Sequence, residues 1–288
     1  MTLKLQKNRF LREFSTFGIG GPIHSFAEIT SLLDLQEAFA FARAENLPIL
    51  SIGKGSNSLF PDRGFDGLAL LFKNDSCEWR ENRVRVGAGY SFSLLGSQSA
   101  RRNLSGLEFA SGIPASVGGA IFMNAGANKR ETADSLVQVT FVHKDGRVQE
   151  YMRSELAFSY RKSPFHAMPG AIFEAIFELT PLESARKNQL ALLDHRMKTQ
   201  PLKEKSAGCV FLNPPGPLSA GALIEKCQLK GVSVGGAKVS EVHANFIINT
   251  GEAKASDVLD LIALVQERVL RETQIALKTE IQIYEPEG

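Results

Sequence analysis

Long hydrophobic runs and a strong excess of one charge are both missing from this chain of 288 residues. No window approaches the length of apolar sequence that crosses a bilayer, and the basic start carries no apolar stretch of signal-peptide length. The net charge is only +2, and no cluster of lysine and arginine is interleaved with aromatics. We therefore expect a cytoplasmic protein without membrane insertion and without a nucleic-acid partner.

Cysteine and histidine are also scarce. The chain has three cysteines (Cys77, Cys209 and Cys227), an odd number with no C-x-x-C spacing. This pattern is typical of a reducing compartment and disfavours a disulfide framework. The five histidines are scattered, and none stands at helical spacing from another ligand type. We expect no metal site.

The common nucleotide-binding motifs are absent as well. No window reads G-x-G-x-x-G or G-x-x-x-x-G-K-[ST], which disfavours Rossmann and P-loop folds. Two other glycine-rich segments instead follow probable strands: GKGSN at 53–57 and SGIPASVGGAIFMNAGA at 111–127. Glycine lets backbone N–H groups come close to phosphate oxygens, although many such loops are plain turns. Two of them, far apart in sequence, suggest one extended diphosphate ligand held from both sides.

The chain length and the 43% of hydrophobic residues suit two domains. The patterns predict helices at 31–46, 91–102, 183–197 and 219–227, and a further amphipathic helix capped by Ser256 or Asp257. They predict strands at 48–52, 65–72, 84–88, 136–143, 147–152, 171–179, 245–250 and 278–284. Asp145-Gly146 signals a hairpin turn. Pro181 marks the expected change of domain, giving 1–181 and 182–288.

The pair of glycine-rich loops resembles the FAD-binding domain of the vanillyl-alcohol-oxidase (PCMH) type. The 111–127 run in particular resembles the UDP-N-acetylenolpyruvoylglucosamine reductase family, and the likeness extends from FSTFGIGG at 14–21 to EIQI at 280–283. The resemblance implies an α+β fold: a PCMH-type FAD-binding domain of two α+β subdomains, followed by a C-terminal α/β substrate-binding domain. The short spacing between Arg161 and Cys209 resembles the type II form.

The same resemblance implies that FAD lies along the glycine loops without a covalent bond, since no histidine stands near them. An R-x-x-x-Q-P sequence at 196–201 adds an arginine that would meet the flavin diphosphate; a solvated helix-end arginine is the alternative. The implied cofactor-binding residues are Gly53, Lys54, Gly55, Ser56, Asn57, Ser58, Ser111, Gly112, Pro114, Ser116, Val117, Gly118, Gly119, Asn124, Gly126 and Arg196.

Two motifs would carry catalysis. Tyr160-Arg161-Lys162-Ser163 matches the family's Y-R-x-S, in which the arginine contacts the enolpyruvyl carboxylate; an exposed arginine is the plain alternative. In Gly208–Pro214 this chain has Cys209 where the family usually has the serine that donates a proton. A thiol is a better acid than a hydroxyl and is still mostly protonated at neutral pH. The alternative is a small buried side chain.

The remaining matches are single residues. Glu280 stands where the family has its catalytic glutamate, although a charge on a strand edge would also explain it. Gln282 replaces an arginine of the family. The resemblance places Tyr160, Asn213 and His243 against the UDP-sugar substrate. For Asn213 the alternative is a turn at Asn-Pro-Pro-Gly, and for His243 a structural hydrogen bond.

Together these features predict an enzyme of peptidoglycan precursor synthesis. NADPH would reduce FAD, flavin N5 would deliver hydride to the enolpyruvyl ether of the UDP-sugar, and Cys209 would add the proton. Arg161 and Glu280 would stabilise the charge that develops. We expect a monomer. Two alternatives stay open: an FAD-dependent oxidase or dehydrogenase of a hydroxy acid or sugar, and a flavin- or UDP-sugar-binding protein without catalysis.

Overall fold

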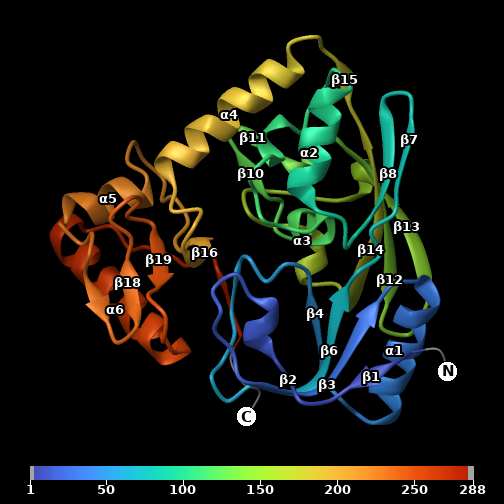
Figure 1. Ribbon diagram of the computed structural model, residues 1–288, viewed down its shortest axis with the longest axis horizontal. Helices are drawn as coiled ribbons and strands as arrows, with labels where there is room; N and C mark the ends of the chain where they lie inside the picture. Colours follow the sequence, from blue (N-terminus) through green and yellow to red (C-terminus); the bar gives the residue numbers. More distant parts are fainter. Residues whose placement is uncertain (1–2, 285–288) are drawn as a thin grey trace. The chain divides into compact units, whose positions relative to one another are not determined.

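The computed structural model describes residues 3–284, which form two compact units (Figure 1). The first unit contains the segment ending at Lys7, Ser25–Lys54 and Asp66–Arg196. The second contains Asn8–His24, Gly55–Phe65 and the segment from Met197 onward. This division by contacts differs from the expected boundary at residue 181, because two early segments pack with the C-terminal part of the chain. The division into an FAD-binding and a substrate-binding domain at 181/182 stays a prediction.

One sheet of the first unit carries the first glycine-rich loop at a strand end. Its order is β1 (Leu5–Gln6), β3 (Pro22–Ile29), β6 (Phe65–Phe72) and β4 (Ile49–Ile52), with β4 and β6 parallel. Between β3 and β4 runs α1 (Leu32–Ala44), whose Ser31 hydroxyl accepts from the Asp34 N–H at 3.1 Å. This is a capping box, which satisfies N–H groups that lack helical partners. The structure confirms the predicted helix at 31–46 and the predicted strands at 48–52 and 65–72.

The second sheet of this unit is antiparallel throughout. Its order is β13 (Val148–Met152), β12 (Leu136–His143), β14 (Gly170–Glu178), β8 (Arg83–Gly87) and β7 (Cys77–Arg80). The turn between β12 and β13 contains Gly146 at φ +91°, as the Asp-Gly signal predicts. The other elements here are α2 (Phe92–Arg101), α3 (Val117–Phe122), the start of α4 (Ala185–Thr199), the short strands β9 (Leu104–Ser105), β10 (Gly126–Ala127), β11 (Arg130–Glu131) and β15 (Thr180–Pro181), and 3₁₀ turns at Glu108–Ala110, Thr132–Asp134, Arg153–Glu155 and Pro164–His166.

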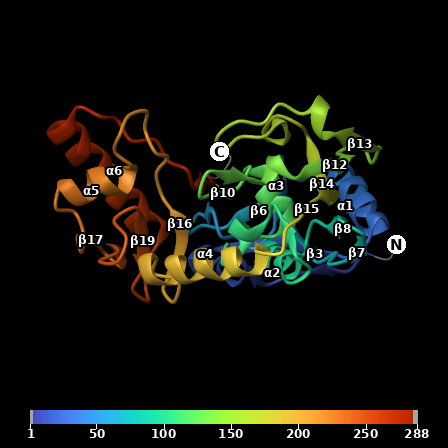
Figure 2. The ribbon, with the colours of Figure 1, turned by 90° about the horizontal axis from the view of Figure 1, so that it is seen from above.

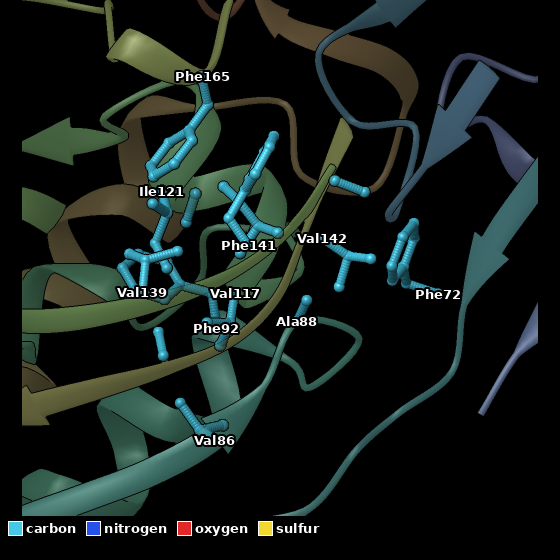
Figure 3. Close-up of a cluster of buried hydrophobic side chains, with 14 of the residues drawn as sticks. Phe72, Val86, Ala88, Phe92, Val117, Ile121, Val139, Phe141, Val142 and Phe165 are labelled. Atoms are coloured by element: carbon cyan, nitrogen blue, oxygen red, sulfur yellow. The ribbon is translucent and has the colours of Figure 1, made fainter. Parts of the chain in front are cut away.

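The core of the first unit fixes α3, the helix that follows the second glycine-rich loop. Figure 3 shows Val117 and Ile121 of α3 pointing toward Phe141 of β12, which stacks on Phe165 with ring centroids 5.3 Å apart. Val142, the next residue of β12, lies on the other side of the strand, toward Phe72. This alternation is the normal two-residue period of a strand. Apolar packing on the Phe141 face of β12 therefore holds α3 and the loop before it in place.

The second unit is built on an antiparallel sheet in the order β16 (Lys205–Cys209), β19 (Phe246–Asn249), β18 (Ala237–Val239) and β17 (Ser233–Val234). Figures 1 and 2 show α5 (Ala220–Lys226) and α6 (Ala255–Thr273) lying together beside this sheet. The strands β5 (Ser58–Leu59) and β20 (Gln282–Ile283) pair in parallel, and β2 (Arg9–Phe10) and a 3₁₀ turn at Leu11–Phe14 complete the unit. Among residues 3–284, no helix has the length and apolar character to cross a membrane.

The start of α6 corrects one expectation. Its N-cap is Lys254, not Ser256 or Asp257, and Asp257 stands inside the first turn. The Asp257 carboxylate accepts from the N–H groups of Lys254 and Gly236, each at 3.0 Å. The next N–H groups, of Ala255 and Ser256, donate to the carboxylate of Asp62. A carboxylate from a distant segment thus does part of the work of a cap, and the local sequence cannot signal it.

Asp257 gives a stability prediction that depends on pH. The hydrogen bonds from the Lys254 and Gly236 backbones lower the pKa of Asp257 below its usual value. A lowered pKa in the folded state stabilises the protein above the unfolded-state pKa of about 4, and that contribution is lost as the pH falls through the folded-state value. Urea denaturation should therefore show Asp257→Asn less stable than the parent at pH 7, with a smaller gap near pH 3. An equal gap at both pH values would contradict this role.

Candidate functional site

The two glycine-rich loops meet in the first unit. Gly53 directly follows β4, and a Cβ built on it would lie only 2.2 Å from the Ser116 hydroxyl oxygen. Ser116 is the N-cap of α3, and its hydroxyl accepts from the Gly119 N–H at 3.2 Å. Only glycine allows so close an approach. The structure thus brings together two segments that the sequence suggested as parts of one site, with the exposed Lys54 next in the chain.

Arg196 lies against the second loop, as the R-x-x-x-Q-P match suggested. Gly112 has φ +85°, and a Cβ there would lie 3.0 Å from the Cδ atom of Arg196 and 3.0 Å from a methyl of Leu193. The Gly112 N–H donates to the Ser93 hydroxyl at 2.7 Å. Ser111 is buried, whereas Pro114 is exposed. The aliphatic part of Arg196 therefore packs on glycine.

Several backbone groups of the second loop are already used by the protein. The N–H of Val117 donates to the Tyr90 carbonyl and that of Gly118 to the Ala88 carbonyl, each at 2.9 Å. A Cβ on Gly118 would lie 2.9 Å from the Cβ of Ala88. These bonds anchor the loop on the segment between β8 and α2. Any contact of Val117 or Gly118 with a cofactor stays a prediction and would have to use other atoms.

Arg161 stands at the tip of a tight turn in the first unit. Ser159 and Lys162 exchange two backbone hydrogen bonds of 3.0 Å around it, and Arg161 itself has φ +58°. Its guanidinium donates to the Gly126 carbonyl at 2.9 Å and lies over the Tyr160 ring, 4.8 Å from the centroid. The structure therefore brings the Y-R-x-S motif to the end of the second glycine-rich loop.

The rest of the first glycine-rich loop, 55–58, belongs to the second unit. Gly55 has φ +57°, and a Cβ there would overlap the Phe14 carbonyl. The Asn57 amide donates to the Glu280 carbonyl at 3.2 Å, and the Asn57 carbonyl accepts from the Gln282 N–H at 2.8 Å. Ser58 pairs with Gln282 in the β5–β20 ladder. The loop is thus joined to the segment that carries Glu280.

Cys209 and Glu280 lie on neighbouring segments of the same unit. The Glu280 N–H donates to the carbonyl of Val210, the residue after Cys209, at 2.7 Å. Phe211 and Thr279 form an antiparallel bridge next to this bond. Cys209 ends β16 and pairs with Phe246, and both its side chain and that of Glu280 are half-buried. The loop residue Ser56 is close as well, with its carbonyl 3.9 Å from a Cβ built on Gly208.

Asn213 and His243 have hydrogen bonds of their own in this unit. Asn213 is exposed, and its side-chain oxygen accepts from the Ala220 N–H at 3.0 Å at the start of α5. The Nδ1 of His243 accepts from the Asn245 N–H at 3.2 Å, and its ring lies 4.9 Å from that of Phe246. The contact of His243 matches its structural alternative, whereas the bond of Asn213 reaches the start of α5 and does not close a turn within Asn-Pro-Pro-Gly. Their contact with substrate stays a prediction.

Asn245 fixes the backbone just after Cys209, a role that the sequence did not predict. Its amide donates to the Phe211 carbonyl at 2.8 Å, and its oxygen accepts from the Phe211 N–H at 2.9 Å. The side chain is 4% exposed. The one available signal was a lone asparagine just before an apolar strand. Within residues 3–284, no group of three or more histidine, cysteine or acidic side chains could hold a metal ion.

We expect Asn245→Ala to lower the free energy of unfolding by about 3 kcal/mol, because it leaves a buried N–H and a buried carbonyl of Phe211 without partners. Urea denaturation followed by circular dichroism measures this. The matched control is Asn188→Ala on the exposed side of α4, where the amide donates to the Ser184 hydroxyl at 3.4 Å. Equal stability losses in the two variants would contradict the assignment.

Comparison with protein families matches both parts of the chain. Residues 24–151 match a family described as an FAD binding domain. Residues 200–284 match the C-terminal domain of UDP-N-acetylenolpyruvoylglucosamine reductase. The first match contains the second glycine-rich loop, and the second contains both Cys209 and Glu280.

Similar proteins cover nearly the whole chain. A UDP-N-acetylenolpyruvoylglucosamine reductase of Protochlamydia amoebophila is 55% identical over 96% of this chain and 93% of its own. One from Chlamydia trachomatis serovar L2 is 46% identical over 97% and 96%. The crystal structure of the reductase (MurB) from Thermus caldophilus has a TM-score of 0.82 at 37% identity and covers 99% of this chain and 100% of its own.

These likenesses confirm the resemblance that the motifs showed, the FAD-binding class of the fold and FAD as the cofactor. The similarity extends across both compact units, so it includes the glycine loops as well as the C-terminal motifs. The chain belongs to the UDP-N-acetylenolpyruvoylglucosamine reductase family.

Proposed function

We propose that this protein reduces the enolpyruvyl ether of UDP-N-acetylglucosamine to UDP-N-acetylmuramate, with NADPH as reductant, in peptidoglycan precursor synthesis. The observation that carries the proposal is the joining of the Cys209 and Glu280 segments through the 2.7 Å bond between Glu280 and Val210. Family membership supports the substrate. The UDP-sugar is the partner, and we propose a monomer of the cytoplasm.

The glycine-rich loops fit a flavin dinucleotide. A Cβ on Gly53 would overlap Ser116, whereas one on Gly119 would meet only the Ser116 hydroxyl, at 3.3 Å. The loops thus touch through glycine, and the side-chain position of Gly119 is left open, although its N–H is used by the Ser116 cap. Gly53–Ser58, the 111–126 loop and Arg196 would hold the FAD. Bound there, FAD would supply the hydride chemistry that links NADPH to the vinylic methylene carbon of the substrate.

Arg161 would bind the enolpyruvyl carboxylate. A guanidinium offers a rigid fork of N–H donors that matches a carboxylate and keeps its charge at any physiological pH. Hydride addition leaves negative charge on the carbon beside that carboxylate, spread onto its oxygens. A fixed cation at this point stabilises the charge as it develops, which lowers the barrier more than it strengthens substrate binding.

Cys209 and Glu280 would complete the addition. The thiol of Cys209 gives its proton to the carbon beside the carboxylate, and the resulting thiolate regains a proton from solvent. A protonated Glu280 donates a hydrogen bond to the charged oxygens in the meantime. Proton delivery from one fixed side chain reaches one face of the carbon, which sets the configuration of the lactyl ether.

The experiment is an absorption spectrum of the purified protein during stepwise additions. We expect the bands of bound flavin, bleaching by NADPH, and return of the bands when the enolpyruvyl UDP-sugar is added without oxygen. Oxygen consumption with a hydroxy acid or a sugar, and no response to the enolpyruvyl substrate, would favour an oxidase. A yellow protein that never turns over would favour a binding protein.

A further inference from the structure

Asn124 is a fully buried polar residue whose side chain turns into the protein. Its exposed fraction is 0%, and its backbone has φ +43°, which asparagine tolerates better than most residues. Its side-chain oxygen accepts from the Ala133 N–H at 3.1 Å. Its amide nitrogen donates to the Glu131 carboxylate at 2.7 Å and to the Ser159 carbonyl at 3.0 Å. Both N–H bonds of the amide are therefore used within the protein.

One of these bonds ends on the turn that carries Arg161. Ser159 is the residue whose N–H and carbonyl close that turn with Lys162. Arg161 occupies a left-handed conformation, which costs a non-glycine residue energy and persists only where the surroundings fix it. The bond from Asn124 holds the carbonyl at the base of the turn, and so limits where the guanidinium can go.

The other bond ends on the hairpin that supports the guanidinium itself. Glu131 pairs with Gly126 in the β10–β11 ladder, and a Cβ on Gly126 would lie 3.1 Å from the Cγ of Glu131. The Gly126 carbonyl accepts from Arg161 at 2.9 Å. A closed ring results: Asn124 bonds to Glu131, Glu131 pairs with Gly126, Gly126 receives Arg161, and the Arg161 turn returns through Ser159 to Asn124.

We propose that Asn124 is a positioning residue for Arg161. Its amide bonds to the base of the turn through Ser159, and it also bonds to the hairpin that receives the guanidinium, through Glu131. This inference rests on the role proposed for Arg161 in reduction, and it gives the side chain of Asn124 a task other than touching the cofactor. An amide is needed because it alone combines two N–H donors with an acceptor on one short, planar group.

The test uses Asn124→Gly in the full-length flavoprotein. Glycine accepts the left-handed backbone, so the variant removes the amide without adding strain. We expect faster hydrogen exchange at the Ser159 and Lys162 amides, with flavin still bound. We also expect the rate of substrate reduction, divided by the rate of flavin reduction in the same variant, to fall by about 10- to 100-fold, as small misplacements of a catalytic group do.

A double-mutant cycle with Arg161→Ala tests whether Asn124 acts through the arginine. If it does, adding Asn124→Gly to Arg161→Ala causes little further loss of rate. If the rate losses of the two single variants multiply in the double variant, the inference is overturned. Unchanged hydrogen exchange at Ser159 and Lys162 in Asn124→Gly would also overturn it. If the exchange rises but Arg161→Ala is as fast as the parent, the ring positions Arg161 as inferred and the role proposed for Arg161 in reduction fails instead.

A second pair of variants separates positioning from stability. Asn124→Asp places a carboxylate against Glu131, and Asn124→Asp with Glu131→Gln restores a donor–acceptor pair there but leaves the Ser159 carbonyl without its donor. We expect the double variant to regain thermal stability relative to Asn124→Asp, while exchange at Lys162 stays fast and substrate reduction stays slow. Full recovery of the reduction rate would contradict the need for the bond to Ser159.

Discussion

Cys209→Ala is expected to slow reduction of the enolpyruvyl substrate strongly while NADPH still reduces the bound flavin. Methyl has no acidic proton, so the carbon beside the carboxylate would have to take its proton from water. Loss of a general acid commonly costs about 10²- to 10⁴-fold in rate. Stopped-flow absorbance of the flavin measures the two half-reactions separately, and only the second should slow.

Cys209→Ser is the matched rescue, because a hydroxyl at the same position is the donor that the family usually carries. It should retain substantial turnover, and it should resist alkylating reagents that inactivate the parent. Bound substrate should protect the parent thiol from the same reagents. The control is Cys77→Ala in the other unit, where burial raises the pKa of the thiol. Full activity of Cys209→Ala would remove the thiol from the mechanism.

Arg161→Ala is expected to slow substrate reduction by about 10²- to 10³-fold, the usual effect of removing one preorganised charge-stabilising group. Arg161→Lys should recover part of the loss, because an ammonium keeps the charge but lacks the fork that pairs with a carboxylate. Both substitutions place a non-glycine residue at φ +58°, so backbone strain is matched between them.

Lys162→Ala is the control on the same turn, since its exposed side chain stands next to Arg161 and is absent from the proposed chemistry. It should leave both half-reactions unchanged. Stopped-flow traces in which Arg161→Ala slows only the oxidation of NADPH would contradict the assignment. Flavin fluorescence checks that the cofactor is retained in every variant.

Much of the local structure could be predicted because it depends on short-range patterns. The strands at Phe65–Phe72 and Leu136–His143 have the bounds that the patterns predicted, and Ser31 caps α1 as expected. The predictions failed where the deciding partner is distant. At the start of α6, the Asp62 carboxylate bonds to Ala255 and Ser256, a choice that the helix sequence does not contain.

The last predicted strand shows the same limit. The pattern at 278–284 predicted a continuous strand, but β20 is only Gln282–Ile283 and the earlier residues pair singly, through the Phe211–Thr279 bridge and the Glu280–Val210 bond. The segment changes partners along its length, from residues 210–212, which follow β16, to the 55–58 loop. Alternating side chains carry no information about such a change, because both pairings need the same extended backbone.

The amino-acid order by itself determined the family, the flavin and the candidate site residues, because the glycine loops and the Y-R-x-S and Gly-Cys-Val-Phe motifs are local and specific. Tertiary structure alone decided what each of those residues touches. It showed that Gly53 meets Ser116, that Asn57 bonds to the Glu280 segment, and that the amide of Asn124 faces inward to the Arg161 turn. The physical reason is that apolar packing places the elements, and hydrogen bonds then form between the groups that lie close together in space. The spacing of residues along the chain does not reveal which groups those are.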